Sequence, residues 1–125
     1  MVASGLVIRD KKALLIFHPY IKQWFQPGGH IDGGELPIDA AIREVYEETG
    51  LVCILDPENS EIIDVDIHEI PANPCKGEGA HLHIDLLYSL EVVREEKSLE
   101  GIACSWTAFE QIDSPRIRRA LLKLA

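Results

Sequence analysis

The sequence has no long hydrophobic run and only three cysteines. Hydrophobic residues make up 46% of its 125 residues, but no run approaches the about 18 residues that a membrane span needs. The start, MVASGLVIRDKKALLIF, lacks a basic segment followed by a long apolar stretch and a small-residue cleavage site, so we expect no signal peptide. Cys53, Cys75 and Cys104 show neither CxxC spacing nor a disulfide framework, which indicates reduced thiols and a cytoplasmic location.

Basic residues are also scarce. The chain has 12 Lys and Arg against 21 Asp and Glu, a formal net charge of −9. Its only basic cluster is short: Arg116, Arg118 and Arg119. This balance argues against a nucleic acid polymer or an anionic membrane as the main partner. A small polyanion could still bind if a divalent cation lay between it and the protein. The length fits a single domain over residues 1–125.

Hydrophobic patterns predict several strands. We expect them over residues 2–9, 13–17, 51–55, 62–70, 81–93 and 101–107, with a short extended piece at 24–26. The first two strands are close enough to form a hairpin. The stretch PANPCKGEGA, residues 71–80, is rich in Pro and Gly and is expected to be a loop.

Two helices complete the pattern. The segment Pro37–Thr49 carries apolar residues at helical spacing, with Pro37 suited to the first turn and Gly50 to the C-terminal stop. A final helix is expected from Ser114-Pro115 onward, with these side chains inward: Ile117, Leu121, Leu122 and Leu124. A hairpin, a helix, further strands and a helix predict an α/β/α sandwich, in which helices cover both faces of a mixed sheet.

Three carboxylates gather on the first helix. Glu44, Glu47 and Glu48 stand at i, i+3 and i+4, where like charges disfavour a helix by roughly 0.2–0.5 kcal/mol per pair. Glu44 and Glu48 lie at the edge of the apolar stripe, with Glu47 further round. A hard cation such as Mg²⁺, which takes oxygen ligands, would offset this repulsion. The alternative is a solvated acidic face, on which Arg43 makes surface ion pairs of little energetic value.

The residues before the helix favour the cation. From Gly29 to Leu51 the sequence reads GHIDGGELPIDAAIREVYEETGL. The segment follows the pattern G-x5-E-x7-R-E-U-x-E-E-x-G-U, in which x is any residue and U is an aliphatic residue. The segment resembles a complete Nudix box, in register, and covers 23 of the 125 residues.

The resemblance implies a fold, an activity and a set of site residues. Nudix proteins are α/β/α sandwiches with a mixed sheet, and they typically hydrolyse a nucleoside diphosphate linked to another group, using Mg²⁺ or Mn²⁺. Carried over, the metal ligands would be Glu44, Glu47, Glu48 and the main-chain carbonyl of Gly29. Arg43 would hold a glutamate carboxylate in place, and Glu35 would support or orient the site. Nudix enzymes often form dimers, so a homodimer is a further expectation.

The implied chemistry is attack by water on one phosphorus of a pyrophosphate. Divalent ions neutralise the charges that repel the nucleophile and lower the pKa of a bound water. Glu44 or Glu47 could take the proton. Some Nudix enzymes use a carboxylate from a later loop instead, for which the candidates here are Glu95, Glu96 and Glu100.

Several residues outside the box are candidates for substrate binding. Trp24 could stack on a base or pack in the core. His81, His83 and Asp85 alternate along a predicted strand and share one face. They could line the substrate pocket, bind a transition metal or be structural. Two further expectations concern packing. The segment 106–110 should pack against the core, and Cys53 and Cys104 should be small buried hydrophobes.

The substrate is assigned by elimination. ADP-ribose enzymes of the family often have a Pro some 16 residues beyond the box, and diadenosine polyphosphate enzymes a Tyr slightly further on. This chain has neither, since Ile67, His68 and Glu69 occupy that region. We therefore expect a MutT-like nucleoside triphosphate pyrophosphohydrolase. The alternatives are a hydrolase of nucleoside diphosphate sugars or dinucleoside polyphosphates, a non-catalytic nucleotide-binding module, and an isoprenoid diphosphate isomerase, which Cys53 fits poorly.

Overall fold

A computed structural model describes residues 1–19, 21–70, 77 and 79–124. The strands are β1 (Val2–Arg9), β2 (Lys12–Phe17), β3 (Trp24–Phe25), β4 (Gly28–His30), β5 (Leu51–Leu55), β6 (Ile62–Ile70), β7 (His81–Glu95) and β8 (Cys104–Ala108). The helices are α1 (Pro37–Thr49), the short 3₁₀ helix η2 (Phe109–Gln111) and α2 (Pro115–Leu124). Cys75 and most of the loop expected over 71–80 lie outside the described residues.

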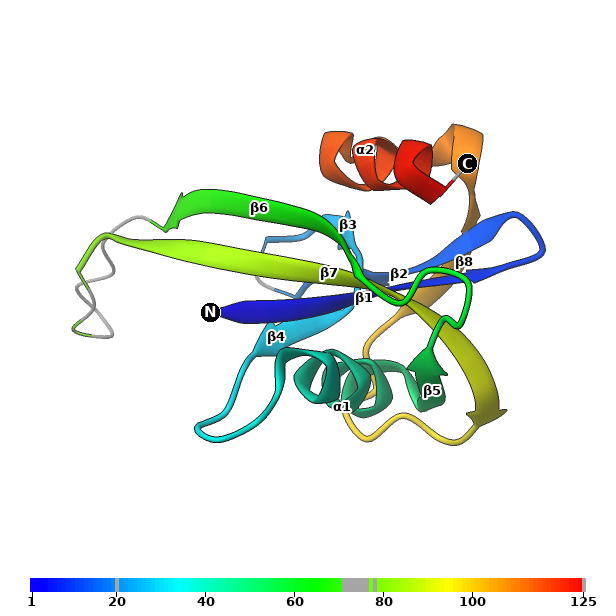
Figure 1. Cartoon of the computed structure of the whole chain (residues 1–125), viewed down its shortest axis with the longest axis horizontal. Coiled ribbons are helices and arrows are strands. Elements are labelled where there is room, and N and C mark those ends of the chain that lie inside the picture. Colours follow the sequence, from blue (N-terminus) through cyan, green and yellow to red (C-terminus); the bar gives the residue numbers. More distant parts are fainter. Residues whose placement is uncertain (20, 71–76, 78, 125) are drawn as a thin grey trace.

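The strands form one mixed sheet with a helix on each face, as Figure 1 shows. Its central path runs β3-β2-β1-β7-β5, while β4 pairs with β1, β6 with β7 and β8 with β2. The β1–β7 pair is parallel and the other pairs are antiparallel. The predicted α/β/α sandwich with a mixed sheet is confirmed. In the described residues, no helix has the length and apolar character that crossing a bilayer requires.

The first two strands form the expected hairpin. Asp10 and Lys11 connect them with φ angles of 54° and 60°. Two consecutive residues with positive φ give the turn a twist that matches the right-handed twist of the strands. The hairpin holds β1 and β2 in register, with Ile8 opposite Ala13.

Helix α1 has the predicted bounds. Pro37 occupies the first turn, where a missing N–H costs nothing. Gly50 ends the helix with φ 78°, and its N–H donates to the carbonyl of Tyr46 at 2.8 Å. A Cβ at Gly50 would lie 2.1 Å from the carbonyl oxygen of Glu96. Glycine is therefore required here for two reasons, its positive φ and the close approach of the chain.

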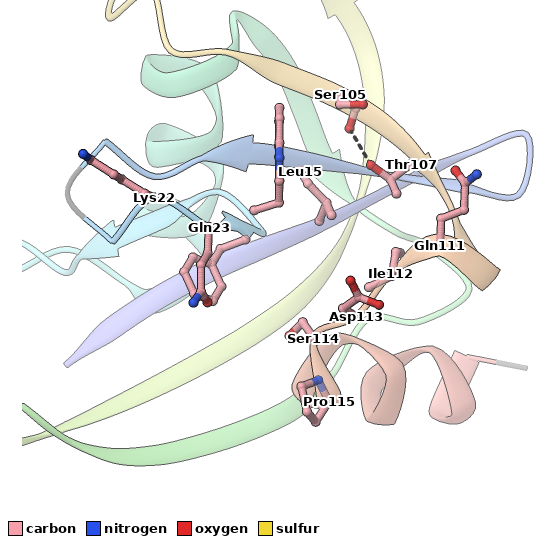
Figure 2. Close-up of a pocket in the computed structure, with 12 residues that line it drawn as sticks. Leu15, Lys22, Gln23, Ser105, Thr107, Gln111, Ile112, Asp113, Ser114 and Pro115 are labelled. Carbon is pink, nitrogen blue, oxygen red and sulfur yellow. Dashed lines mark hydrogen bonds between the residues drawn. The ribbon is translucent and has the colours of Figure 1, made fainter.

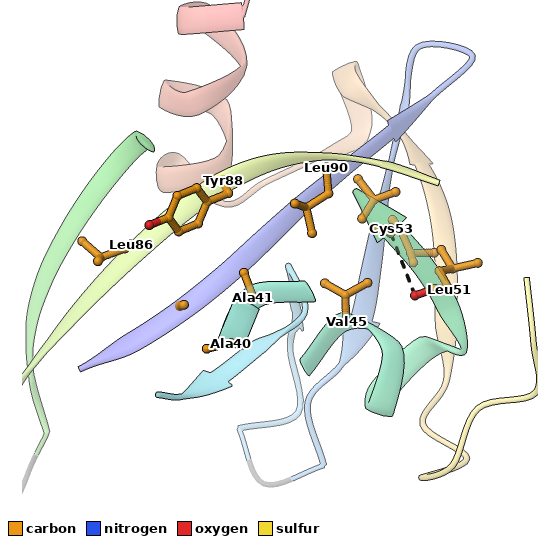
Figure 3. Packing of buried hydrophobic residues seen from close by; sticks show 11 residues of the cluster. Ala40, Ala41, Val45, Leu51, Cys53, Leu86, Tyr88 and Leu90 are labelled. Atoms are coloured by element: carbon orange, nitrogen blue, oxygen red, sulfur yellow. Dashed lines mark hydrogen bonds between the residues drawn. The ribbon is translucent and has the colours of Figure 1, made fainter. Parts of the chain in front are cut away.

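Two hydrophobic clusters hold the helices to the sheet. Between α1 and the sheet lie buried residues that include Val7, Leu14, Val45, Leu86 and Leu90, shown in part in Figure 3. The opposite cluster, under α2, includes Leu6, Leu15, Leu87, Ile117 and Ala120. Consecutive residues of β1, β2 and β7 thus face opposite cores. This explains why the central strands are continuously apolar rather than alternating.

Three expectations at the level of elements were wrong. Residues 28–30, which are not among the predicted strands, form strand β4, because β1 supplies a partner that local sequence does not reveal. Leu122 is 78% exposed, and Ala120 takes the inward position on α2. Cys104 is exposed on edge strand β8, whereas Cys53 is buried as expected. Trp106 is half-buried and packs against the α1 cluster, which confirms its predicted role.

Candidate active site

Glu48 points from α1 toward the core. It is only 9% exposed and lies among the buried residues of the helix with Ala41 and Val45. Its Oε1 accepts a hydrogen bond from the backbone N–H of Gly28 at 2.8 Å. Pairing of β4 with β1 holds Gly28 in place for this contact. Helical spacing predicted Glu48 at the edge of the apolar stripe. In the structure its carboxylate is buried against Gly28 of β4.

Glu44 lies one turn earlier and contacts the next glycine. A Cβ added to Gly29 would stand 2.5–2.7 Å from the carboxylate atoms of Glu44. Only glycine lets strand and carboxylate approach so closely. Gly29 and Glu44, two members of the predicted metal-ligand set, therefore lie in direct contact.

Arg43 joins the acidic residues of the box. Its Nε and Nη2 donate to the two carboxylate oxygens of Glu35, at 2.9 and 3.0 Å. Nη1 donates to Glu44 at 2.8 Å and approaches Glu47 at 3.3 Å. Nη2 also donates to the carbonyl of His30 at 3.0 Å. The geometry of Arg43 therefore agrees with the role that the resemblance implied, since it fixes Glu35 and Glu44 and ties α1 to β4.

The carboxylates carry more negative charge than the protein neutralises. Burial, together with the neighbouring charges of Glu44, Glu100 and Glu47, raises the pKa of Glu48 to about 8. The pKa of Glu44 is also raised, chiefly by burial, although Arg43 opposes the shift. A buried carboxyl beside a partly buried one, both of which resist ionisation, forms a site where an added positive charge is stabilising. Such a site suits a divalent cation.

The donor set fits a hard cation. Carboxylates and a main-chain carbonyl are the ligands that Mg²⁺ and Mn²⁺ prefer. Among the described residues, no group of three or more His, Cys, Asp or Glu side chains is already arranged to hold a metal ion. Arg43 lies against Glu44 and Glu47 in this conformation. Ion binding would thus require these two side chains to turn from Arg43 toward Glu48.

The three candidates for a general base differ in position, and Glu95 is the last residue of strand β7. Glu95 pairs with Arg9 at 3.1 Å. Glu96 accepts hydrogen bonds from Tyr46 at 3.0 Å and Arg94 at 2.7 Å. Glu100 is the one whose charge raises the pKa of both Glu44 and Glu48. Its position singles out Glu100 among candidates that the sequence could not separate.

A cavity of about 570 Å³ is lined in part by strand β4. Gly28 and Gly29, which contact the buried carboxylates, line it together with His83 and Asp85. Phe25 adds an aromatic wall. The structure therefore joins His83 and Asp85 to the glycine strand of the box.

Asp85 is held by two protein donors. It is 6% exposed, and its carboxylate accepts from the hydroxyl of Ser4 and from Nη1 of Arg116. Arg116 reaches it from the first turn of α2, where it also pairs with buried Asp64 at 3.2 Å. Asp64 further accepts from Arg119 and Lys123 at 2.7 Å. Asp85 and Arg116 thus form a fixed polar wall of the cavity.

Trp24 lies apart from His83 and Asp85. It is 42% exposed, so it does not pack in the core, and its ring meets that of Phe17 at 5.4 Å. It lines a different, larger cavity of about 730 Å³, bounded by β3, β8 and the start of α2 (Figure 2). Among its lining residues none belongs to the 29–51 segment. Phe25 and Ser114 line both cavities, which are therefore adjacent.

Sequence reasoning missed several residues of the smaller cavity. Ser4 and Arg116 come from opposite ends of the chain and meet only because α2 packs over β1 and β7. His30 and His68 approach His83 through strand pairing, with ring centroids 5.4 and 5.5 Å away. Cross-strand register brings these residues together, and no local motif encodes it.

Comparison with known proteins gave matches in sequence and in structure. The family model described as NUDIX domain matches residues 1–124. A probable DHNTP pyrophosphohydrolase of Lactococcus lactis is 41% identical over 97 residues, or 78% of this chain and 57% of that protein. An RNA pyrophosphohydrolase of Brucella anthropi is 51% identical over 45 residues, or 35% of this chain and 26% of that protein.

A solved structure matches along nearly the whole chain. The MutT NUDIX hydrolase from Burkholderia pseudomallei has a TM-score of 0.70 and 25% identity, covering 99% of this chain and 96% of that one. The chain spans little more than half the length of the Lactococcus relative. The structural similarity to the Burkholderia protein therefore extends over the residues that carry the carboxylates and line both cavities.

Proposed function

Because the chain belongs to the Nudix family, we propose that it hydrolyses the pyrophosphate bond of a nucleotide-like triphosphate with the help of a divalent cation. The observation that carries this proposal is the burial of Glu48 next to Glu44 and the glycine strand. Burial and the neighbouring carboxylates raise the pKa of Glu48, so an added positive charge would stabilise this site. A solvated acidic face would not bury a carboxylate in this way.

Mg²⁺ or Mn²⁺ is the proposed cation, held by Glu44, Glu47, Glu48 and the carbonyl of Gly29. When bound, such an ion polarises the phosphate and lowers the pKa of a coordinated water. Arg43 and Glu35 are proposed as positioning residues, supported by their paired hydrogen bonds of 2.9 and 3.0 Å. The proton of the attacking water would pass to Glu44, Glu47 or Glu100.

The smaller cavity is the proposed substrate pocket. It begins at Gly28 and Gly29, so the phosphate chain of a substrate there would lie near the carboxylates. His83, Asp85 and Arg116 would contact the remainder of the molecule. A role for Trp24 in stacking is proposed only for a substrate long enough to reach the second cavity through Phe25.

A triphosphate is preferred as the substrate. The Lactococcus relative is named for DHNTP, and the sequence lacks the Pro and Tyr markers described above. The alternative substrates are a nucleoside diphosphate sugar and a dinucleoside polyphosphate. The alternative function is nucleotide binding without catalysis. The net charge of −9 disfavours a long RNA substrate.

Three further expectations from the sequence are also proposals. We propose a single domain over residues 1–125, supported by the family match over residues 1–124. The free thiols of Cys53 and Cys104 support a cytoplasmic location. A homodimer is proposed from the family resemblance. Light scattering after size exclusion would give a mass of either one or two chains.

A substrate screen tests the proposed activity. The protein would be incubated with Mg²⁺ and, separately, nucleoside triphosphates, oxidised nucleotides, DHNTP, nucleoside diphosphate sugars, ADP-ribose, dinucleoside polyphosphates and 5′-triphosphorylated RNA. Nucleotide products would be separated by ion-exchange chromatography, and phosphate would be measured with and without added pyrophosphatase. We expect a triphosphate to give pyrophosphate, detected only after pyrophosphatase coupling. Turnover of none of these compounds would favour a binding module.

Two variants test the ligands. Glu47→Gln and Glu48→Gln remove a charge while keeping the side-chain shape. We expect each to lower kcat by at least roughly 10²-fold, because these groups stabilise charge in the transition state. Glu110→Gln, on the surface helix η2, is the matched control. Full activity in both variants would contradict the assignment.

A further inference from the structure

Four of the five histidines of the chain lie close together, and three of these four, His30, His68 and His83, line the smaller cavity. His68 on β6 and His83 on β7 are cross-strand partners. His81 lies two residues before His83 on the same face, and His30 ends β4. The ring centroid of His83 is 5.0 Å from that of His81, 5.5 Å from that of His68 and 5.4 Å from that of His30. His83 is therefore the centre of an imidazole cluster.

The two strand histidines already stand at chelating distance. Nε2 of His81 is 3.2 Å from Nε2 of His83. Two nitrogens bound to one ion at about 2.0–2.1 Å with tetrahedral angles are roughly 3.3 Å apart, and the centres of their rings are roughly 5.2 Å apart. The observed separations of nitrogens and of rings both agree with these values.

In two histidines of the cluster, Nδ1 lies within hydrogen-bond distance of an oxygen acceptor. Nδ1 of His81 lies 3.0 Å from the carbonyl oxygen of Gly79. A carbonyl can only accept, so Nδ1 carries the proton and Nε2 keeps its lone pair. Nδ1 of His68 lies 3.1 Å from Oδ2 of Asp66. In neutral His68, Nδ1 therefore carries the proton and Nε2 keeps its lone pair. Donation from the outer nitrogen to a carbonyl or carboxylate is the arrangement that orients histidines bound to metals.

We propose that this cluster is a second metal site, which binds a first-row transition ion of the Zn²⁺ type through imidazole nitrogens. The ligand chemistry separates it from the carboxylate site, since imidazole suits Zn²⁺, Cu²⁺ and Ni²⁺ whereas carboxylates and carbonyls suit Mg²⁺ and Mn²⁺. Burial and the neighbouring histidines lower the pKa of His83, which favours its neutral form. Neutral imidazole is the form that binds metals.

Binding needs one side chain to move. In the described residues no three such side chains are yet arranged to hold an ion, so His81 and His83 supply two ligands and rotation of the His68 ring supplies a third. Water completes the shell. In the absence of metal, Nε2 of His83 donates its proton to Nε2 of His81. Coordination through Nε2 of His83 therefore requires a change of tautomer, in which the ring proton moves to Nδ1 and the neutral imidazole releases no net proton.

Calorimetry on the untagged full chain tests the proposal. ZnCl₂ would be titrated near neutral pH in millimolar Mg²⁺, which saturates the carboxylate site. We expect saturable binding of one Zn²⁺ per chain. Co²⁺ in place of Zn²⁺ should give visible absorption bands that change with the number of nitrogen ligands.

Matched variants identify the ligands. His81→Gln and His83→Gln should each weaken Zn²⁺ binding at least roughly 10-fold, as expected for disruption of a chelating pair. His18→Gln removes a histidine outside the cluster and should bind as the parent does. Circular dichroism would verify that each variant is folded. No Zn²⁺ binding in the presence of Mg²⁺, or equal affinity in all three variants, would overturn the proposal.

Discussion

Replacing Glu48 with Gln should make the protein more stable and less active. Folding raises the pKa of Glu48 from 4.5 to about 8, mainly because the side chain is buried. Between these pH values the folded state binds more protons than the unfolded state. The free energy of unfolding therefore falls as pH rises through this window. Glu48→Gln removes that pH-dependent loss, because a neutral amide cannot ionise.

The magnitude follows from the shift. Each pH unit of pKa difference corresponds to about 1.4 kcal/mol, so the rise to about 8 sets an upper bound of about 5 kcal/mol on the stability lost by ionisation. Oε1 of Gln can still accept the hydrogen bond from Gly28 N–H, which measures 2.8 Å in the parent. With relaxation around the charged side chain, we expect a gain of about 2 kcal/mol at pH above 8.

Urea denaturation at acidic and alkaline pH, without divalent cations, measures the effect. Near pH 5 the parent carboxyl is protonated, so the two proteins should have nearly equal stability. Above pH 8 the variant should be the more stable. Saturating Mg²⁺ should raise the stability of the parent by about 2.7 kcal/mol at 100 times its Kd, and that of the variant by much less. A stability difference that does not change with pH would refute the reasoning.

Three other substitutions test the surroundings of the site. Gly29→Ala places a Cβ about 2.5 Å from the Glu44 carboxylate, so we expect Mg²⁺ affinity, measured by calorimetry, to fall at least roughly 10-fold. Arg43→Lys cannot reproduce the paired hydrogen bonds to Glu35, so kcat should fall at least roughly 10-fold while the fold persists. Asp64→Asn leaves three cationic side chains of α2 without their buried partner, so the free energy of unfolding should fall by about 3 kcal/mol at pH 7.

The pH dependence of Asp64 has the opposite sign to that of Glu48. Burial alone would raise the pKa of Asp64, but hydrogen bonds from Arg119, Lys123 and Arg116 lower it well below its usual range. The stability that Asp64 contributes is therefore present above pH 4 and is lost as the pH falls further. Equal unfolding free energies for Asp64→Asn and the parent at pH 7 would contradict the role of this network.

The sequence predicted best where a local pattern suffices. Helix α1 has its predicted ends because Pro37 and Gly50 act through backbone chemistry alone. The contact of Glu48 with Gly28 follows from helical spacing once β4 is in place, but β4 itself was not predicted. Its three residues have weak strand preference and become extended because β1 pairs with them.

The smaller cavity was predicted only in part. Alternation along β7 correctly grouped His83 and Asp85 on one face, and both line the cavity. Ser4 and Arg116 join them from segments 81 and 31 residues away in sequence. Such contacts depend on how α2 crosses the sheet, and one sequence carries no local signal for that crossing. Trp24 lines the other cavity for a related reason, since its environment is set by β8 and the start of α2.

The most direct test of the central claim is a Mn²⁺ titration followed by electron paramagnetic resonance, which detects free Mn²⁺. The parent would be compared with the combined Glu44→Gln, Glu47→Gln and Glu48→Gln variant. We predict saturable Mn²⁺ binding by the parent, competed by Mg²⁺, and loss of that binding in the variant. Equal binding by the two proteins, or none by the parent, would contradict the claim that these carboxylates bind the catalytic cation.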